Sequence, residues 1–200
     1  MPIIPRIQRL FHCKELGRLQ GLHASHRSEL GVMKIPTDSI TLKHLEDKWP
    51  KKFMDEVRIL RLSIAMDGVN PYSLHNTNYS VWCVVVINNN IPPWFSINNE
   101  HLMLALIVPG RRQVKNMDVY LQPLVDELKE LWDGINVYNV SRPIATEKSF
   151  MLYGICAYMT HDYPGLGVCS CKLHVYLFVY IISHINYLIH CNCSDLHDIL

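Results

Sequence analysis

The chain has 200 residues, of which 49% are hydrophobic and 18% are charged, with 19 Lys and Arg residues against 18 Asp and Glu residues. This length allows one domain with a real core, and the apolar content excludes an intrinsically disordered chain. The formal net charge of +1 excludes a strongly basic nucleic-acid module on bulk electrostatics, while a local basic stripe stays open.

We expect no signal peptide, because the N-terminus has no basic segment followed by an apolar run. Seven cysteines without a secretory signal indicate reduced thiols or metal ligands, and therefore an intracellular protein. Residues 1–56 are mixed and polar, which predicts a partly helical N-terminal lead-in with a solvated face rather than a dedicated DNA contact. Trp49-Pro50 predicts a break within it, since the residue before a proline is pushed out of the helical region.

Three apolar runs closed by turn residues predict three adjacent strands of one sheet. The runs are Val57–Met66, Val81–Ile87 and Leu102–Val108. They are closed by Asp67-Gly68, by the segment 88–93 and by Pro109-Gly110. The second run is continuous and β-branched, which is typical of a strand buried on both faces.

An amphipathic helix follows, with one apolar stripe at a 3.6-residue period. The stripe consists of Leu121, Leu124, Val125, Leu128, Leu131 and Trp132. Asp118 or a neighbour can cap its start, Pro123 is acceptable only in its first turn, and Gly134 ends it. Phe150–Met159 predicts a fourth strand, so residues 57–167 are expected to form an α/β domain with a mixed sheet.

Residues 168–200 form a tail of different composition, rich in Cys, Tyr and Ile. Its apolar stretch 173–189 is short and contains His, Ser and Asn, so we expect no membrane span. The Cys-x-Cys pairs at 169/171 and 191/193 raise the hypothesis of a zinc site. Cysteine pairs that bind zinc usually have wider spacing, so free thiols are the favoured interpretation.

Two acids stand out by position, since Asp67 follows one predicted strand and Asp162 closes another. Two carboxylates held together can bind divalent cations that activate a nucleophile for phosphoryl transfer. However, Asp-Gly is also a strong hairpin signal, and Asp162 shortly before Pro164 fits an ordinary turn. Spacing alone therefore favours turns over catalysis.

For several other polar and aromatic residues, an ordinary surface or core position competes with a functional role. His23 and His26 are expected to be surface histidines rather than metal or DNA contacts. Trp82 and Trp94 are expected to pack in or against the core. For six basic residues the sequence favours phosphate contact and a solvent-exposed face equally. They are Lys51, Lys52, Arg58, Arg111, Arg112 and Lys115.

An ordered set of sequence blocks resembles plant CACTA (En/Spm-type) transposases over roughly residues 1–167. The central block is 60–72, LRLSIAMDGVNPY, and the last is 161–164, HDYP. The other blocks are 5–11, 23–39, 78–82, 91–94, 104–110 and 118–132.

This resemblance implies an incomplete RNase H-like (DDE/D-type) core that cuts and joins DNA with Mg²⁺ or Mn²⁺. Asp67 would be the first catalytic, metal-binding acid and Asp162 the second. The implied partner is DNA at transposon ends, with a full-length transposase or self-association as further options. The implied location is the nucleus.

After Asp162 the chain departs from the family pattern. A Cys-x-Cys pair follows closely, and no later block resembles the region that holds the family's third acid, a Glu. Asp195 and Asp198 in the tail are poor substitutes for it. We therefore expect a transposase fragment that is inactive alone. The rival interpretations are a non-catalytic DNA- or protein-binding remnant of a transposable element and a reading frame without function.

Overall fold

The computed structural model describes residues 1–25, 32–53, 56–71, 79–110, 114, 117–144 and 148–161. Its helices are α1 (Ile4–His12), α2 (Lys14–Leu19), α3 (Leu22–Ser25), the 3-10 helix η1 (Pro36–Asp38), α4 (Ile40–Lys48), α5 (Pro50–Phe53), α6 (Pro93–Ser96) and α7 (Met117–Asp133). Its strands are β1 (Leu60–Val69), β2 (Ser80–Asn88), β3 (Met103–Gly110), β4 (Ile135–Tyr138), β5 (Ser149–Leu152) and β6 (Gly154–Thr160). The expected mixed α/β class is confirmed.

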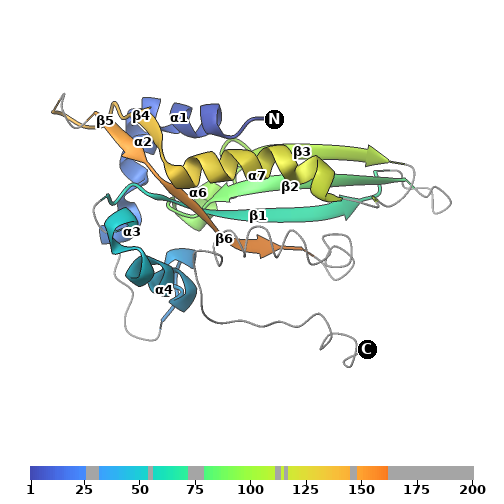
Figure 1. The fold of residues 1–200 in the computed structure, drawn as a ribbon, viewed down its shortest axis with the longest axis horizontal. Coiled ribbons are helices and arrows are strands. Elements are labelled where there is room, and N and C mark those ends of the chain that lie inside the picture. Colours follow the sequence, from blue (N-terminus) through green and yellow to red (C-terminus); the bar gives the residue numbers. More distant parts are fainter. Residues whose placement is uncertain are drawn as a thin grey trace.

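The main sheet has four strands in the order β3-β2-β1-β6 (Figure 1). β1, β2 and β3 are neighbours in this sheet, as the three apolar runs predicted. They pair in antiparallel fashion, whereas β6 is parallel to β1. β1 does not stop at Asp67-Gly68 but continues to Val69. Gly68 lies opposite Trp82 on β2, and a Cβ at Gly68 would come within 2.9 Å of the indole. Gly68 therefore lies within the strand, where the Trp82 indole leaves no space for a side chain, and it does not form the expected turn.

The predicted fourth strand, Phe150–Met159, is wrong because it is two strands. β5 pairs with β4 in a separate two-stranded sheet, whereas β6 pairs with β1. The change of partner falls at Tyr153, whose carbonyl oxygen accepts a hydrogen bond from the Leu60 backbone N–H at 2.9 Å. At Gly154 helix α7 comes so close that an added Cβ would lie 2.4 Å from Leu131 Cδ2.

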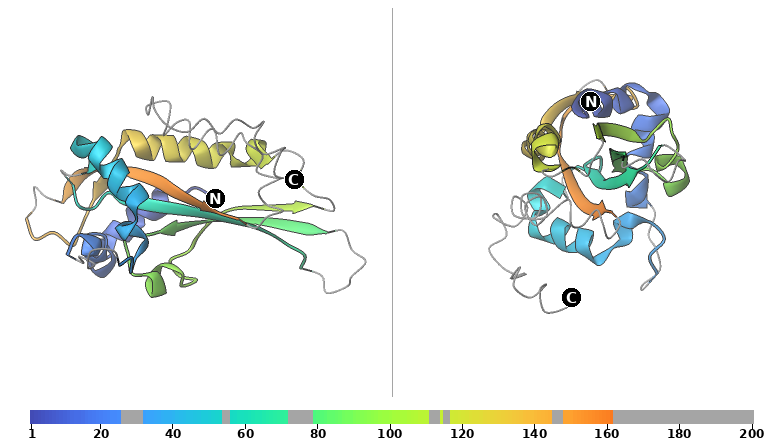
Figure 2. Two further views of the ribbon diagram at one scale, coloured as in Figure 1. Left: turned by 90° about the horizontal axis from the view of Figure 1, so that it is seen from below. Right: turned by 90° about the vertical axis from the view of Figure 1, so that its right-hand side faces the viewer.

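One face of the sheet is covered by α1 and α7. Alternate side chains of β1 enter this core, and they are Leu60, Leu62, Ile64 and Met66. Helix α1 contributes Ile4, Ile7 and Phe11, so it packs on the sheet instead of extending into solvent. Figure 2 shows α1 and α4 on opposite sides of the sheet. Leu42 of α4 belongs to a smaller cluster with Ile59, Trp132 and Ile155.

The expectation that β2 is buried on both faces is wrong. Along β2 buried and half-buried residues alternate, so one face packs in the core and the other is partly covered. Trp82 is 4% exposed, which confirms its core position, whereas Trp94 is 76% exposed and does not pack in the core. Continuous β-branched sequence could not distinguish these two faces.

Helix α7 confirms the predicted amphipathic helix, and its apolar stripe is buried. It ends before Gly134, whose φ of 106° favours glycine. Pro123, however, lies inside the helix rather than in its first turn. Its missing N–H leaves the carbonyl of Val119 without the usual partner, and Val119 is 67% exposed, so water can serve instead. No helix in the described ranges is long and apolar enough to cross a membrane.

Candidate functional site

Asp67 lies where β1 leaves the core. Its neighbour Met66 is buried in the core, whereas Asp67 is exposed and is paired across the ladder with Cys83 of β2. Because successive side chains of a strand alternate between faces, Asp67 stands on the face opposite Met66. The structure thus places the acid in an accessible position near the end of a buried strand, two residues before the strand ends.

The end of the parallel strand β6 lies beside this part of β1. The register pairs Ala65 with Thr160, the last residue of β6. Carboxyl ends of neighbouring parallel strands commonly bind ligands in α/β sheets. Asp162 follows Thr160 by two positions in the sequence and lies outside the described residues. Within the described part, no group of three or more His, Cys, Asp or Glu side chains could hold a metal ion.

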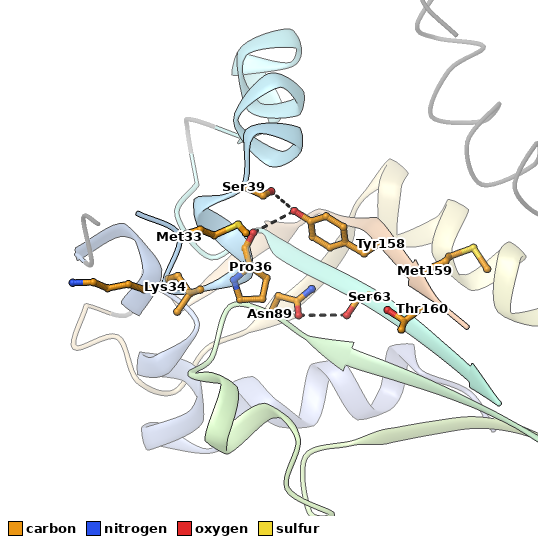
Figure 3. A pocket seen from close by; sticks show the side chains of 10 residues that line it. Met33, Lys34, Pro36, Ser39, Ser63, Asn89, Tyr158, Met159 and Thr160 are labelled. Atoms are coloured by element: carbon orange, nitrogen blue, oxygen red, sulfur yellow. Dashed lines mark hydrogen bonds between the residues drawn. The ribbon is translucent and has the colours of Figure 1, made fainter. Parts of the chain in front are cut away.

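A pocket of about 550 Å³ lies farther back along β1 and β6 (Figure 3). Ser63 lines it from β1, and since Ser63 and Asp67 are four residues apart on one strand, both stand on the same face about 13 Å apart. Tyr158 and Thr160 line it from β6, and Asn89 lines it from the turn after β2.

The polar groups of this pocket mostly bond to one another. Ser63 Oγ donates to Asn89 Oδ1 at 3.4 Å, and the Tyr158 hydroxyl donates to the Pro36 carbonyl at 3.2 Å and contacts the Ser39 hydroxyl. Asn89 is buried, and its Nδ2 has no hydrogen-bond partner among the residues that the structure describes. Among the described residues that line the pocket none is acidic and one, Lys34, is basic, so its chemistry differs from that expected at Asp67.

β1 also carries a buried arginine that sequence reasoning missed. Arg61 donates through Nε to Glu46 Oε1 at 2.8 Å and through Nη1 to His23 Nε2 at 2.8 Å. The prediction that His23 is a plain surface histidine is therefore wrong. Burial, with the charge of Arg61 adding to it, lowers the pKa of His23 from 6.5 to about 4, although the backbone of Gln20 opposes this shift.

Two of the six basic candidates have intramolecular partners. Lys52 donates to the Trp132 carbonyl at 2.7 Å and lies over the Trp132 ring, and burial lowers its pKa against the opposing charge of Asp133. Arg58 is buried and bonded to Glu56. The other four basic candidates lie outside the part of the chain that the structure describes, and they are the Lys51 side chain, Arg111, Arg112 and Lys115. The same is true of His26 and of both cysteine pairs, Cys169/Cys171 and Cys191/Cys193.

Comparison with known proteins identifies the family. The family described as Transposase family tnp2 matches residues 30–183, which is more than half of the chain and includes both Asp67 and Asp162. None of the curated proteins and none of the solved structures that were compared matches the chain. The matched range contains most of the sequence blocks that resemble CACTA transposases. The chain therefore belongs to the tnp2 family of CACTA (En/Spm)-type transposases.

Proposed function

We propose that this chain carries two metal-binding acids of a DDE/D-type transposase, Asp67 and Asp162, in the front part of an RNase H-like core. The reaction is Mg²⁺- or Mn²⁺-dependent cleavage and transfer of DNA strands at transposon ends, in the nucleus. The observation that carries the proposal is the position of Asp67, exposed on β1 beside the end of the parallel strand β6.

The sheet supports the RNase H-like interpretation, because that fold needs its acids at the ends of neighbouring strands. β1 and β6 are such neighbours, and they run in the same direction. Asp67 follows Ala65 by two positions, and Asp162 follows Thr160, the partner of Ala65, by two positions. Because each acid follows a residue of the same cross-strand pair by two positions, the register favours two carboxylates that lie close together.

The donor chemistry also fits. Carboxylate oxygens are hard ligands, which Mg²⁺ prefers, and a hydrated ion can reach an exposed acid such as Asp67 without desolvating a buried charge. When bound, a pair of such ions activates water or a 3′-hydroxyl and stabilises the leaving oxygen. The chain's own part is to hold the two carboxylates at fixed positions on a rigid sheet.

We further propose that Asp67 and Asp162 do not cleave DNA without a third acidic ligand. The sequence blocks that resemble the family include no counterpart of the family's third acid, a Glu. The metals supply most of the charge stabilisation in such a site, so the lack of one ligand should reduce the rate by orders of magnitude.

Calorimetry with Mg²⁺ and Mn²⁺ on the purified chain tests the metal site. We expect binding by the parent and at least about a tenfold loss in Asp67→Asn and in Asp162→Asn, since each removes a charged ligand. Asp47→Asn is the matched control, because Asp47 is an exposed acid on α4, outside the candidate site. Undiminished binding in Asp67→Asn would overturn the proposal.

Cleavage of a labelled duplex tests the second part. Background rates in the parent are the expected result, and metal-dependent cleavage that Asp67→Asn abolishes would contradict the proposed inactivity while supporting the metal site. DNA binding without any metal binding would favour the rival function, a non-catalytic DNA-binding remnant.

A further inference from the structure

The end of β1 that carries Asp67 has few supports among the residues that the structure describes. The ladder with β6 reaches Ala65, which pairs with Thr160. From Asp67 onward, the only ladder of β1 in the described part of the chain is with β2. Met66 is buried, and the three residues of β1 that follow it are exposed. The order of Asp67 therefore depends on what holds this last part of β1 against β2.

Gly68 weakens this end of the strand. Glycine in the interior of a strand has no side chain to pack and keeps more backbone freedom than any other residue, so it lowers the order of its neighbours. Gly68 directly follows Asp67 and continues the core-facing row of β1 that ends at Met66. The side chain that would anchor the end of β1 in the core is thus missing from β1 itself.

Trp82 on β2 supplies the missing contact. It pairs with Gly68 across the ladder, so its side chain stands on the same, core-facing side of the sheet. Two carbons of the indole lie so near Gly68 that an added Cβ would be 2.9 Å from each. Trp82 belongs to the same core cluster as Met66. Its Nε1–H is buried without a hydrogen-bond partner in the described ranges, so packing of the ring holds the indole in place.

We propose that Trp82 is a positioning residue for Asp67, an inference that rests on the proposed metal site. An aromatic ring that packs on a cross-strand glycine restores the order that the glycine loses. Asp67 and Gly68 are joined by one peptide bond, so the ring that holds Gly68 on one face of the sheet also holds the backbone from which Asp67 projects on the other face. Metal ligands need such support to keep their direction. Trp82 provides it without touching the metal.

Two readouts and a compensating pair of substitutions test this role. The readouts are the affinity for Mn²⁺ by calorimetry and, without metal, the protection of the segment around Asp67 against hydrogen exchange. Gly68→Ala keeps the indole but forces it away from β1, whereas Trp82→Phe keeps a smaller aromatic ring. The double variant gives the new methyl group room beside the smaller ring. Val86→Ala is the matched control, because Val86 is a buried residue of β2 that pairs with Ile64, about 13 Å from Trp82 along the strand.

We expect Gly68→Ala to weaken Mn²⁺ binding about fivefold and to lower the protection around Asp67, because the displaced indole no longer orders the end of β1. The double variant should recover most of both losses. Val86→Ala should lower the urea midpoint, since it leaves a cavity in the core, but should keep the Mn²⁺ affinity and the protection of the parent. This control separates local order at Asp67 from the stability of the whole fold.

Unchanged Mn²⁺ binding and protection in Gly68→Ala would overturn the positioning role of Trp82. A loss that the double variant does not reduce, or an equal loss in Val86→Ala, would overturn it as well. Lower protection with unchanged Mn²⁺ binding would show that Trp82 orders the strand but does not position the ligand. If the parent binds no Mn²⁺, the proposed function fails, and the protection measurements then decide alone whether Trp82 orders Asp67.

Discussion

His23 should control how the stability of this chain depends on pH. Its pKa is about 4 in the folded chain against 6.5 ordinarily. Between these values the unfolded chain binds more protons at this position than the folded chain does. The free energy of unfolding is therefore highest above pH 6.5 and falls as the pH falls toward 4. The structural reason is that Arg61 donates to His23 Nε2, and only a neutral imidazole can accept that bond.

The magnitude follows from the size of the pKa difference. The full difference corresponds to about 3 kcal/mol at most, and the part lost between about pH 7 and about pH 4.5 is about 2 kcal/mol. Carboxylates also titrate in this range, so the informative quantity is the difference between the parent and a variant that lacks the imidazole.

Urea unfolding at both pH values measures this difference. In His23→Gln the amide oxygen can still accept from Arg61 without taking up a proton, so this variant should lose about 2 kcal/mol less than the parent on acidification. His44→Gln is the control, because His44 is exposed on α4, and it should follow the parent. Equal losses in the parent and in His23→Gln would refute the reasoning.

Two further predictions concern packing. Gly154→Ala should destabilise the fold by about 1–3 kcal/mol, because the new Cβ would lie 2.4 Å from Leu131 Cδ2, and an unchanged urea midpoint would contradict this. Trp82→Ala should cost about 3–5 kcal/mol, since the side chain is buried in the core. Trp94→Ala should change stability by less than about 0.5 kcal/mol, and similar losses in both variants would argue against the observed burial.

Local patterns were enough to predict the elements that are built from local interactions. The stripe of α7 depends only on residues within a few turns, and its range was predicted almost completely. The apolar runs of β1, β2 and β3 were equally visible. The single strand expected at 150–159 was wrong because a strand's partner is set by distant segments, here β4 for one half and β1 for the other.

The position of Asp67 was predictable from its neighbours in the sequence. Asp67 is exposed near the end of a buried strand, as its sequence context indicated. The arginine network on β1 was not predictable, because Arg61 pairs with Glu46 and His23, which are 15 and 38 residues away. The same holds for Asn90, whose side chain donates to the carbonyl of Gln20 across 70 residues. Nothing in a single sequence marks such partners.

The parallel pairing of β6 with β1 has a consequence for the order of folding. The β1–β3 meander joins strands that follow one another along the chain, so its contacts are local. β6 docks only when Gly154 meets Leu60, 94 positions earlier, which closes a much longer loop at a larger entropic cost. In pulse-labelled hydrogen exchange, the amides of β2 should therefore gain protection before those of β6, and the edge that supports the proposed metal site should form last.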